Sequence, residues 1–246
     1  ENILNAKKTN RDTIGAKLED LDQKVAGQLK KGSVAVLTGS ITSPSTKSLL
    51  EEFQTAIEAD WVTWDPISYE TVREGQRRAY GSAVLPRYRV EQAKYIMAVD
   101  CDLLGTYQTP TSYQQQFAKN RKPGPEMNKL VVFEGLRSLT GSNADERYPM
   151  PPSRQLDVVM DLLHELVVVK GRGPYSGNQA VQDQLKPFAG KSEDIVSKKV
   201  LARLADELWQ NRGQSLVVAG DLRSETPWGV SLQVAINFLN TVLEND

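Results

Sequence analysis

LVVFEGLRSLTGSNADER, residues 130 to 147, is the stretch that decides the fold of this chain. Its first four residues, Leu130 to Phe133, are all apolar, which predicts a buried strand. The part from Leu139 to Arg147 is polar, and prolines then lead to a helix that we expect to begin near Ser153. The stretch therefore predicts a strand-to-helix connection of the kind in which α/β proteins hold a phosphate or a sugar.

The composition is that of a globular protein of moderate size. The 246 residues are 39% hydrophobic and 25% charged, which is enough for one large domain or two small ones. The net charge is -1 and neither sign forms a long block, so the chain lacks the electrostatic footprint of a nucleic-acid-binding protein. The longest apolar run, residues 162 to 169, contains His164 and Glu165 and is shorter than the ~20 residues that span a bilayer.

Residues that carry chemistry are sparse. Cys101 is the single cysteine, so these residues form no disulfide among themselves and no cysteine-based zinc or iron–sulfur centre. His164 is the single histidine, and its helical neighbours predict a surface or boundary position. The glycines from Gly171 to Gly177 follow a helix rather than a strand, so they do not predict a dinucleotide site. We assign no catalytic residue and no metal ligand.

Strands alternate with helices along the chain. We predict strands over residues 34–37, 61–64, 95–99, 130–133 and 216–219, and helices over residues 12–29, 44–59, 68–79 and 194–211, near 153 and from 227. Such alternation is typical of a parallel sheet covered on both faces. The predicted fold class is therefore α/β, with a Rossmann-like parallel sheet and helices on both of its faces.

The last third of the chain repeats the order of the first, namely helix, strand, glycine, loop and helix. Residues 171–190 between them are rich in glycine, proline and polar residues and predict a linker loop. We therefore expect a Rossmann-like lobe over residues 1–170 and a second α/β segment over 191–246. The second segment either completes the same sheet or forms a second lobe.

Several segments together resemble a known superfamily. They are Thr38-Gly39-Ser40, Ala93 to Asp100 with Leu103 to Thr106, Leu130 to Phe133, and Ala144-Asp145 before the prolines. In this order they resemble the central α/β domains of the molybdopterin oxidoreductases, the formate dehydrogenase and DMSO reductase type. Within that superfamily, Ser138 to Arg147 most closely resembles the molybdopterin-like iron–sulfur subunit of alternative complex III, a bacterial quinol oxidoreductase.

The resemblance implies a crevice for a pterin cofactor along the strand ends. The candidate cofactor-binding residues that it implies are Thr38, Gly39, Ser40, Asp100, Gly141, Ser142, Asn143 and Asp145. We expect this crevice to be vestigial and to persist as structure only. In that interpretation Asp145, Glu146 and Arg147 cap a helix and pair locally.

Two departures from the superfamily pattern argue that the cofactor has been lost. Asp100 and Asp102 stand where small residues would let backbone N–H groups approach a diphosphate. A carboxylate ~5 Å from a phosphate charge costs about 3 kcal/mol at an effective dielectric constant of about 20. The superfamily's Pro-Gly-Thr-Asp element, which contacts the guanine end, is replaced by Pro152-Ser153-Arg154-Gln155.

The resemblance therefore implies a cofactor-free scaffold within an iron–sulfur subunit of a respiratory complex that oxidises quinol. The alternative is the cofactor-binding domain of an active molybdenum or tungsten oxidoreductase, with molybdopterin guanine dinucleotide bound and Asp100 touching guanine or ribose. A third hypothesis is a free-standing module that binds a nucleotide or a sugar phosphate. In the scaffold interpretation, we do not expect this piece of the protein to catalyse a reaction by itself.

Partners and location follow from the resemblance alone. The chain begins without methionine and has no signal-peptide pattern, so we expect it to be a piece of a longer polypeptide. The implied partners are the remaining domains of that parent chain, which would carry the iron–sulfur clusters, and other subunits of a membrane-attached complex. The implied location is the periplasmic side of a bacterial inner membrane.

Overall fold

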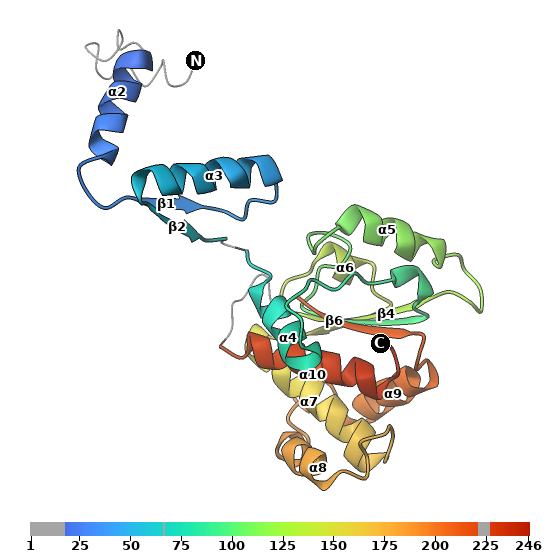
Figure 1. The fold of residues 1–246 in the computed structure, drawn as a ribbon. Helices are drawn as coiled ribbons and strands as arrows, with labels where there is room; N and C mark the ends of the chain where they lie inside the picture. The colour runs from blue at the N-terminus through green and yellow to red at the C-terminus, as the bar shows by residue number, and fades with distance from the viewer. Residues whose placement is uncertain (1–17, 66, 221–226) are drawn as a thin grey trace. The chain divides into compact units, whose positions relative to one another are not determined.

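The computed structural model describes residues 18–65, 67–220 and 227–246. The chain divides into two compact units, Glu1–Pro66 and Ile67–Asp246. The predicted first helix is seen as α2 (Leu18–Leu29), and the predicted residues 12–17 lie outside the described part. Figure 1 shows the elements of both units, which are described separately below.

The first unit contains one strand–helix–strand repeat. β1 (Ala35–Thr38) and β2 (Asp60–Thr63) pair in parallel, with Ala35 opposite Asp60. α3 (Pro44–Ile57) connects them, and it begins with proline after Ser43, whose hydroxyl accepts the N–H of Thr46. No described residue of α3 is buried, so this unit has little core of its own.

The second unit is built on a four-stranded parallel sheet in the order β5-β4-β3-β6. Its strands are β3 (Tyr95–Val99), β4 (Lys129–Glu134), β5 (Glu146–Pro149) and β6 (Ser215–Ala219). Tyr95 lies opposite Lys129 on one side and Ser215 on the other. All of β3 is buried because strands cover both of its edges and helices cover both of its faces.

Alternate side chains of the sheet enter two hydrophobic cores. Met97, Val99 and Phe133 point to the face covered by α7 (Gln155–His164), α9 (Lys198–Gln210) and α10 (Gly229–Val242). Ile96, Ala98 and Val132 point to the opposite face, where α5 (Pro110–Lys119) packs through Tyr113 and Phe117. In Figure 1, α5 and the short α6 (Leu139–Ser142) lie on that opposite side of the sheet.

Two further helices complete the second unit. α4 (Glu70–Tyr80) packs against α10, and α8 (Gln179–Leu185) packs near α7. α7 continues directly into a π-helical turn, Glu165–Val169, in which the N–H of Lys170 bonds to the carbonyl of Glu165. His164 ends α7 at this junction and is partly buried.

The division of the chain differs from the predicted one. The boundary between compact units follows Pro66, whereas we predicted one lobe over 1–170. Residues 171–190, predicted as a linker loop, include α8. β6 from the predicted second segment pairs with β3, so that segment adds a strand to the sheet of the preceding residues. Of the two alternatives that the sequence left open for this segment, the pairing of β6 with β3 supports completion of the same sheet.

Candidate functional site

The carboxyl ends of β3 and β4 form the candidate site. In an open parallel sheet, ligands bind outside these ends, where loops and helix N-termini present backbone N–H groups. Here the loop after β3 runs from Asp100 to Thr109, and the loop after β4 leads from Glu134 to α6. What this edge can bind depends on which of its polar groups are already paired.

The Asp102 carboxylate is bonded to the start of α6. Its Oδ1 accepts the N–H of Thr140 at 3.1 Å and the Thr140 hydroxyl at 2.9 Å. Thr140 Oγ1 in turn accepts the N–H of Leu104 at 2.8 Å. The Asp102 carbonyl accepts the N–H groups of Gly105, Thr106 and Tyr107, each at 3.0 Å. One acidic residue therefore ties the loop after β3 to the loop after β4.

Glu134 plays the same part at the end of β4. Its carboxylate is almost fully buried and accepts the N–H of Ser138 at 3.2 Å and the Ser138 hydroxyl at 2.6 Å. Arg147 Nε donates to it at 2.6 Å, which supplies the counter-charge that a buried carboxylate needs. Ser138 Oγ then accepts the N–H of Gly141, so the first turn of α6 is capped from within.

Two glycines make room for these carboxylates. A Cβ at Gly105 would lie 2.1 Å from Asp102 Oδ2, and a Cβ at Gly141 would lie 1.8 Å from Glu134 Oε1. Glycine near a strand end often allows a ligand to approach the backbone. At both of these positions the space beside the glycine holds an acidic side chain of the chain itself.

Asp100 lies at the same edge, directly after β3. Its φ of 47° is in the left-handed region, which is uncommon for a residue other than glycine. Its Oδ2 accepts the side-chain N–H of the fully buried Gln155 at 2.7 Å, and its N–H bonds to the carbonyl of Phe133. The N–H of Gly220, at the end of β6, bonds to the carbonyl of Val99. Asp100 thus joins β3 to the start of α7.

The first unit repeats this arrangement with Asp65. The Asp65 carboxylate accepts the N–H of Ser40 at 2.8 Å and also the Ser40 hydroxyl. These two hydrogen bonds, the hydroxyl first, lower the pKa of Asp65 below its ordinary value. Gly39 faces the same carboxylate, and Thr38 Oγ1 accepts the indole N–H of Trp61 at 2.9 Å. Of the three predicted residues, Gly39 and Ser40 therefore face an aspartate, whereas Thr38 bonds to Trp61.

Ser142 and Asn143 are bonded within α6 and its cap. The Ser142 hydroxyl donates to the carbonyl of Ser138 at 2.8 Å, and the Asn143 amide donates to the carbonyl of Leu139 at 2.8 Å. Gly141, Ser142 and Asn143 thus lie together near the end of β4, whose neighbour β3 ends at Val99, directly before Asp100. Thr38, Gly39 and Ser40 belong to the other unit.

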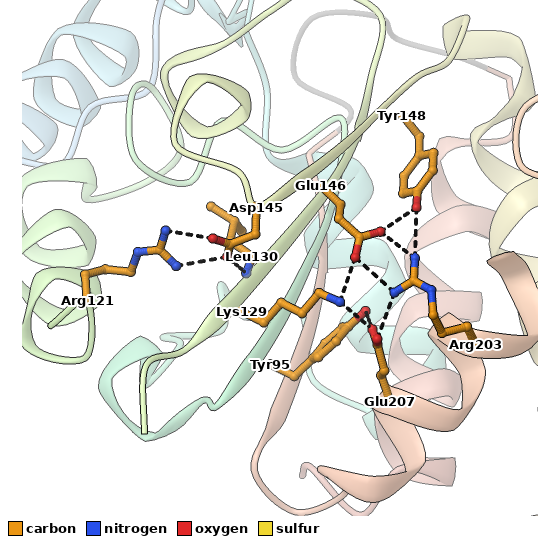
Figure 2. Close-up of polar contacts among 9 residues, drawn as sticks. All are labelled: Tyr95, Arg121, Lys129, Leu130, Asp145, Glu146, Tyr148, Arg203 and Glu207. Carbon is orange, nitrogen blue, oxygen red and sulfur yellow. Dashed lines mark hydrogen bonds and ion pairs between the residues drawn. The ribbon is translucent and has the colours of Figure 1, made fainter. Parts of the chain in front are cut away.

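The predicted role of Asp145 is wrong. It caps no helix, and Glu146 and Arg147 form strand β5 rather than a helix entrance. Asp145 lies at the amino end of β4, where its carboxylate accepts the N–H of Leu130 at 2.7 Å and two N–H groups of Arg121 at 2.9 Å (Figure 2). Between Ser138 and Asp145 the chain runs back along β4 through α6. Ser138 therefore lies at the carboxyl end of β4, and Asp145 lies at its amino end.

A network of charges surrounds the amino end of the sheet beside Asp145. Figure 2 shows its members, which come from β3, β4, β5 and α9: Tyr95, Lys129, Glu146, Tyr148, Arg203 and Glu207. Arg203 donates to Glu146 at 2.6 and 2.9 Å and to Glu207 at 2.8 Å, and Lys129 bridges the same two carboxylates. The network ties α9 to three strands.

Charge pairing sets the protonation states in this network. Burial alone would raise the pKa of Glu146, but hydrogen bonds from Arg203, Lys129 and Tyr148 outweigh it and lower this pKa to about 2. Burial, together with the carboxylate of Glu146, raises the pKa of Tyr148 to about 12. The hydrogen bond to Glu146 also raises the pKa of Arg203. All of these groups are therefore held in their ordinary ionisation states near neutral pH, which suits a structural role.

Five N–H groups at the described carboxyl ends of β3 and β4 do not fit a cofactor diphosphate. A diphosphate needs several unpaired N–H donors, whereas those of Leu104, Gly105, Ser138, Thr140 and Gly141 already donate to groups of the chain. Among the described residues, no group of three or more histidine, cysteine, aspartate and glutamate side chains is arranged to hold a metal ion. Within the same residues, no helix is long and apolar enough to cross a membrane.

Sequence reasoning placed Asp100 and Asp102 at this edge but missed the parts played by Asp65 and Glu134. A signal for Glu134 was present, because it directly follows the predicted strand 130–133 and precedes Ser138 by four residues, about one helical turn. An acidic residue at such a position can reach the first N–H groups of a short helix. Asp65 lies two residues after the end of β2.

Comparison with solved structures reveals a distant relative in fold. Acetylene hydratase from Pelobacter acetylenicus superposes on the chain with a TM-score of 0.70 at 11% sequence identity. The match covers 94% of this chain and 33% of the acetylene hydratase chain. That neighbour is a member of the molybdopterin oxidoreductase family. The likeness shows a distant relationship in fold.

This likeness confirms the predicted fold class, a Rossmann-like α/β fold with a parallel sheet and helices on both faces. The chain spans about a third of the length of this structural neighbour. No protein-family model and no curated protein matches its sequence. At 11% identity the likeness concerns the fold, because one fold carries many functions.

Proposed function

We propose that this chain is a cofactor-free, molybdopterin-oxidoreductase-like domain that serves as a scaffold within a larger electron-transfer protein. Its parent would be an iron–sulfur subunit of a respiratory complex that oxidises quinol, of the alternative complex III type. In this proposal the parent carries the iron–sulfur clusters elsewhere, faces the periplasm of a bacterial cell and docks onto other subunits. The domain itself has no catalytic residue.

One observation carries the proposal. The acidic side chains of Asp65, Asp102 and Glu134 each accept a backbone N–H and a hydroxyl at a strand end, in positions where this fold would present such donors to an anion. A bound diphosphate would have to displace these carboxylates and break their hydrogen bonds. Each buried donor or acceptor left unpaired costs about 1–3 kcal/mol, so the displacement is unfavourable.

The length of the match supports a parent larger than this chain. Acetylene hydratase contains about two thirds of its length outside the matched region. If the parent protein is of similar size, it has ample chain to hold the clusters and docking surfaces that the domain lacks.

A second candidate is supported by the fold likeness itself, because the structural neighbour is named as an enzyme. In that case the domain would hold molybdopterin guanine dinucleotide in an active molybdenum or tungsten oxidoreductase. The carboxylate networks would then have to open when the cofactor binds. The two candidates make opposite predictions about pterin in the purified protein.

The decisive experiment is elemental analysis of the intact parent protein purified from membranes, together with an assay for released pterin. Iron without molybdenum, tungsten or pterin supports the scaffold proposal. Stoichiometric pterin with either metal overturns it in favour of the second candidate. Absence of iron contradicts the iron–sulfur parent, and failure to co-purify with other respiratory subunits contradicts the complex.

A titration with GDP and with inorganic pyrophosphate tests the binding edge directly. Under the scaffold proposal neither ligand raises the melting temperature of the protein, because a ligand stabilises only a state that it binds. A rise that saturates with GDP concentration would contradict a closed edge. Such a rise would favour a nucleotide-binding module or the cofactor-binding candidate.

A further inference from the structure

A surface pocket of about 550 Å³ lies beside the start of α5, within the second unit. Its lining includes Tyr69, Leu85, Pro86, Arg87 and Tyr113. The volume is within the range of pockets that bind small molecules, about 300 to 1,000 Å³. None of these residues belongs to the carboxylate networks at the ends of β3 and β4, so the pocket raises a separate question of function.

The apolar part of the pocket is held in place by hydrogen bonds. The backbone N–H of Gln108 donates to the Tyr69 hydroxyl at 2.7 Å, and the Tyr113 hydroxyl donates to Gln108 Oε1 at 2.7 Å. Behind them, the Tyr107 ring meets Tyr69 edge to face, with 5.8 Å between ring centroids. Leu85 adds an apolar side chain that is 40% exposed. These contacts describe a preformed hollow suited to a flat apolar ring.

The polar part of the pocket is positive. Arg87 is exposed and forms no ion pair with any residue that the structure describes. α5 begins at the pocket, where Thr109 provides no side-chain cap and Pro110 has no N–H. The N–H groups of Thr111 and Ser112 bond to no described acceptor, so the positive end of this helix is open.

Gln108, which also lines the pocket, has an unpaired side-chain donor. Gln108 Nε2 is shielded from solvent and has no hydrogen-bond acceptor among the described groups. The pocket therefore combines an apolar hollow with a guanidinium and a helix N-terminus.

We propose that this pocket binds a small aromatic carboxylate. The ring lies against Tyr69, Leu85 and Pro86, and the carboxylate faces Arg87 and the first turn of α5. An anionic group suits this end of the pocket because Arg87 is a cation and the first turn of α5 offers N–H donors. The site is independent of the scaffold role proposed above, since neither its residues nor its ligand enter that argument.

The test uses saturation-transfer NMR on the intact protein with 4-methylbenzoate as the probe, because the method tolerates a large protein. A probe of about ten heavy atoms is expected to bind with a Kd of about 1 mM. The matched neutral probe is 4-methylbenzyl alcohol, and inorganic phosphate is the anion without a ring. We expect 4-methylbenzoate to bind at least about five-fold more tightly than either of them.

The variants separate the charge from the apolar wall. Arg87→Gln is expected to weaken binding of 4-methylbenzoate about five-fold or more, and Leu85→Glu to abolish it. Arg89→Gln, which removes an exposed arginine two residues away, is the matched control and should bind the probe as the wild type does. All three positions are exposed, so the folded state is expected to persist, which a circular dichroism spectrum verifies.

Three outcomes would overturn the proposal. The first is no binding of 4-methylbenzoate up to about 10 mM, ten times the expected Kd. The second is equal binding to the Arg87→Gln variant and to the wild type. The third is equal affinity for phosphate, which would indicate a simple anion at a helix end rather than a site for an aromatic acid.

Discussion

At the scale of single residues, the strand ends of this chain are occupied by its own carboxylates. Glu134 fills the space beside Gly141 and bonds to Ser138, so a short helix of four residues is capped and anchored. Such a contact requires the absence of a side chain at residue 141. The contact also occupies N–H donors at the strand end, which in other proteins with open parallel sheets can bind an anion.

Replacing Gly141 by alanine tests this contact. Helix propensity favours alanine over glycine by about 1 kcal/mol, but the new Cβ would lie 1.8 Å from Glu134 Oε1. We therefore expect the free energy of unfolding to fall by about 2 kcal/mol, measured by urea denaturation.

The control is Gly177→Ala, where a Cβ meets nothing within 4 Å. That substitution should change the free energy of unfolding by less than about 0.5 kcal/mol. Equal effects of the two substitutions would show that Glu134 moves away at no cost and that the strand end is open.

Asp145 makes a second prediction at this scale. Asp145→Ala removes a two-fold ion pair with Arg121 and leaves the N–H of Leu130 without its side-chain acceptor. We expect a loss of about 2 kcal/mol in the free energy of unfolding, since both partners are about three-quarters buried.

A double-mutant cycle with Arg121→Gln distinguishes this ion pair from a general effect of truncation. The coupling energy between the two positions is expected to be about 1 kcal/mol. Additive effects of the two substitutions would contradict a direct interaction between Asp145 and Arg121.

At the scale of elements, the edge strand β5 depends on charges more than on apolar burial. None of its four residues is fully buried, and its link to α9 passes through Glu146 and Arg203. Tyr148 adds a stacked contact with Phe133, with ring centroids 4.9 Å apart. The attachment of β5 should therefore depend on pH.

The pKa of Glu146 gives the direction of that dependence. It is about 2 in the folded chain against an ordinary value of 4.5, so the unfolded chain binds more protons between these two values. The stabilisation by Glu146 is complete above about pH 5 and is lost as the pH falls toward 2. Its size is about 2 kcal/mol after allowance for partial exposure.

Urea denaturation at a series of pH values from 6 down to 2 measures this loss. The Glu146→Gln variant should be less stable than the wild type at pH 6, and the difference should shrink as the pH falls. A difference that is constant over this range would show that the charge of Glu146 contributes nothing to the attachment of β5.

At the scale of the whole molecule, the two units are unequal. Both hydrophobic cores lie in Ile67–Asp246, on the two faces of its sheet. In Glu1–Pro66, Ala59 is the one buried apolar residue among those described, and the sheet has two strands. A two-stranded sheet is marginally stable by itself.

We therefore expect a polypeptide of residues 67–246 to unfold in one cooperative transition on heating, followed by circular dichroism at 222 nm. A polypeptide of residues 1–66 is expected to show no such transition, because it buries too little apolar surface. A cooperative transition of residues 1–66 would contradict this distribution of stability. Failure of residues 67–246 to fold would show that their core depends on the first unit.

Much of the fold could be predicted because its central strands are apolar throughout. β3 lies at the predicted residues, and β4 exceeds the prediction by one residue at each end. α5 escaped prediction because it is rich in glutamine and polar residues, and only Tyr113 and Phe117 bury in the core. β5 escaped because its four residues are polar or proline, and only the pairing with β4 makes them a strand.

The candidate site was predictable in part for a related reason. Residues that directly follow a buried strand, such as Asp100, lie at the carboxyl edge by necessity. Asp145 follows a short helix, and the sequence does not state how far that helix carries the chain back across the sheet. Its partner Arg121 is 24 residues away, a separation that local patterns cannot bridge.

The sequence by itself determined the class of this protein, because alternating apolar strands and amphipathic helices can bury their surfaces only in a layered α/β arrangement. It also determined that acidic residues stand at the strand ends. Only the tertiary structure decided which groups some of those residues meet: the Asp102 carboxylate accepts the N–H of Thr140, which lies 38 residues away in α6. Hydrogen bonds between distant segments depend on how the chain packs, and that packing is not encoded in any local pattern.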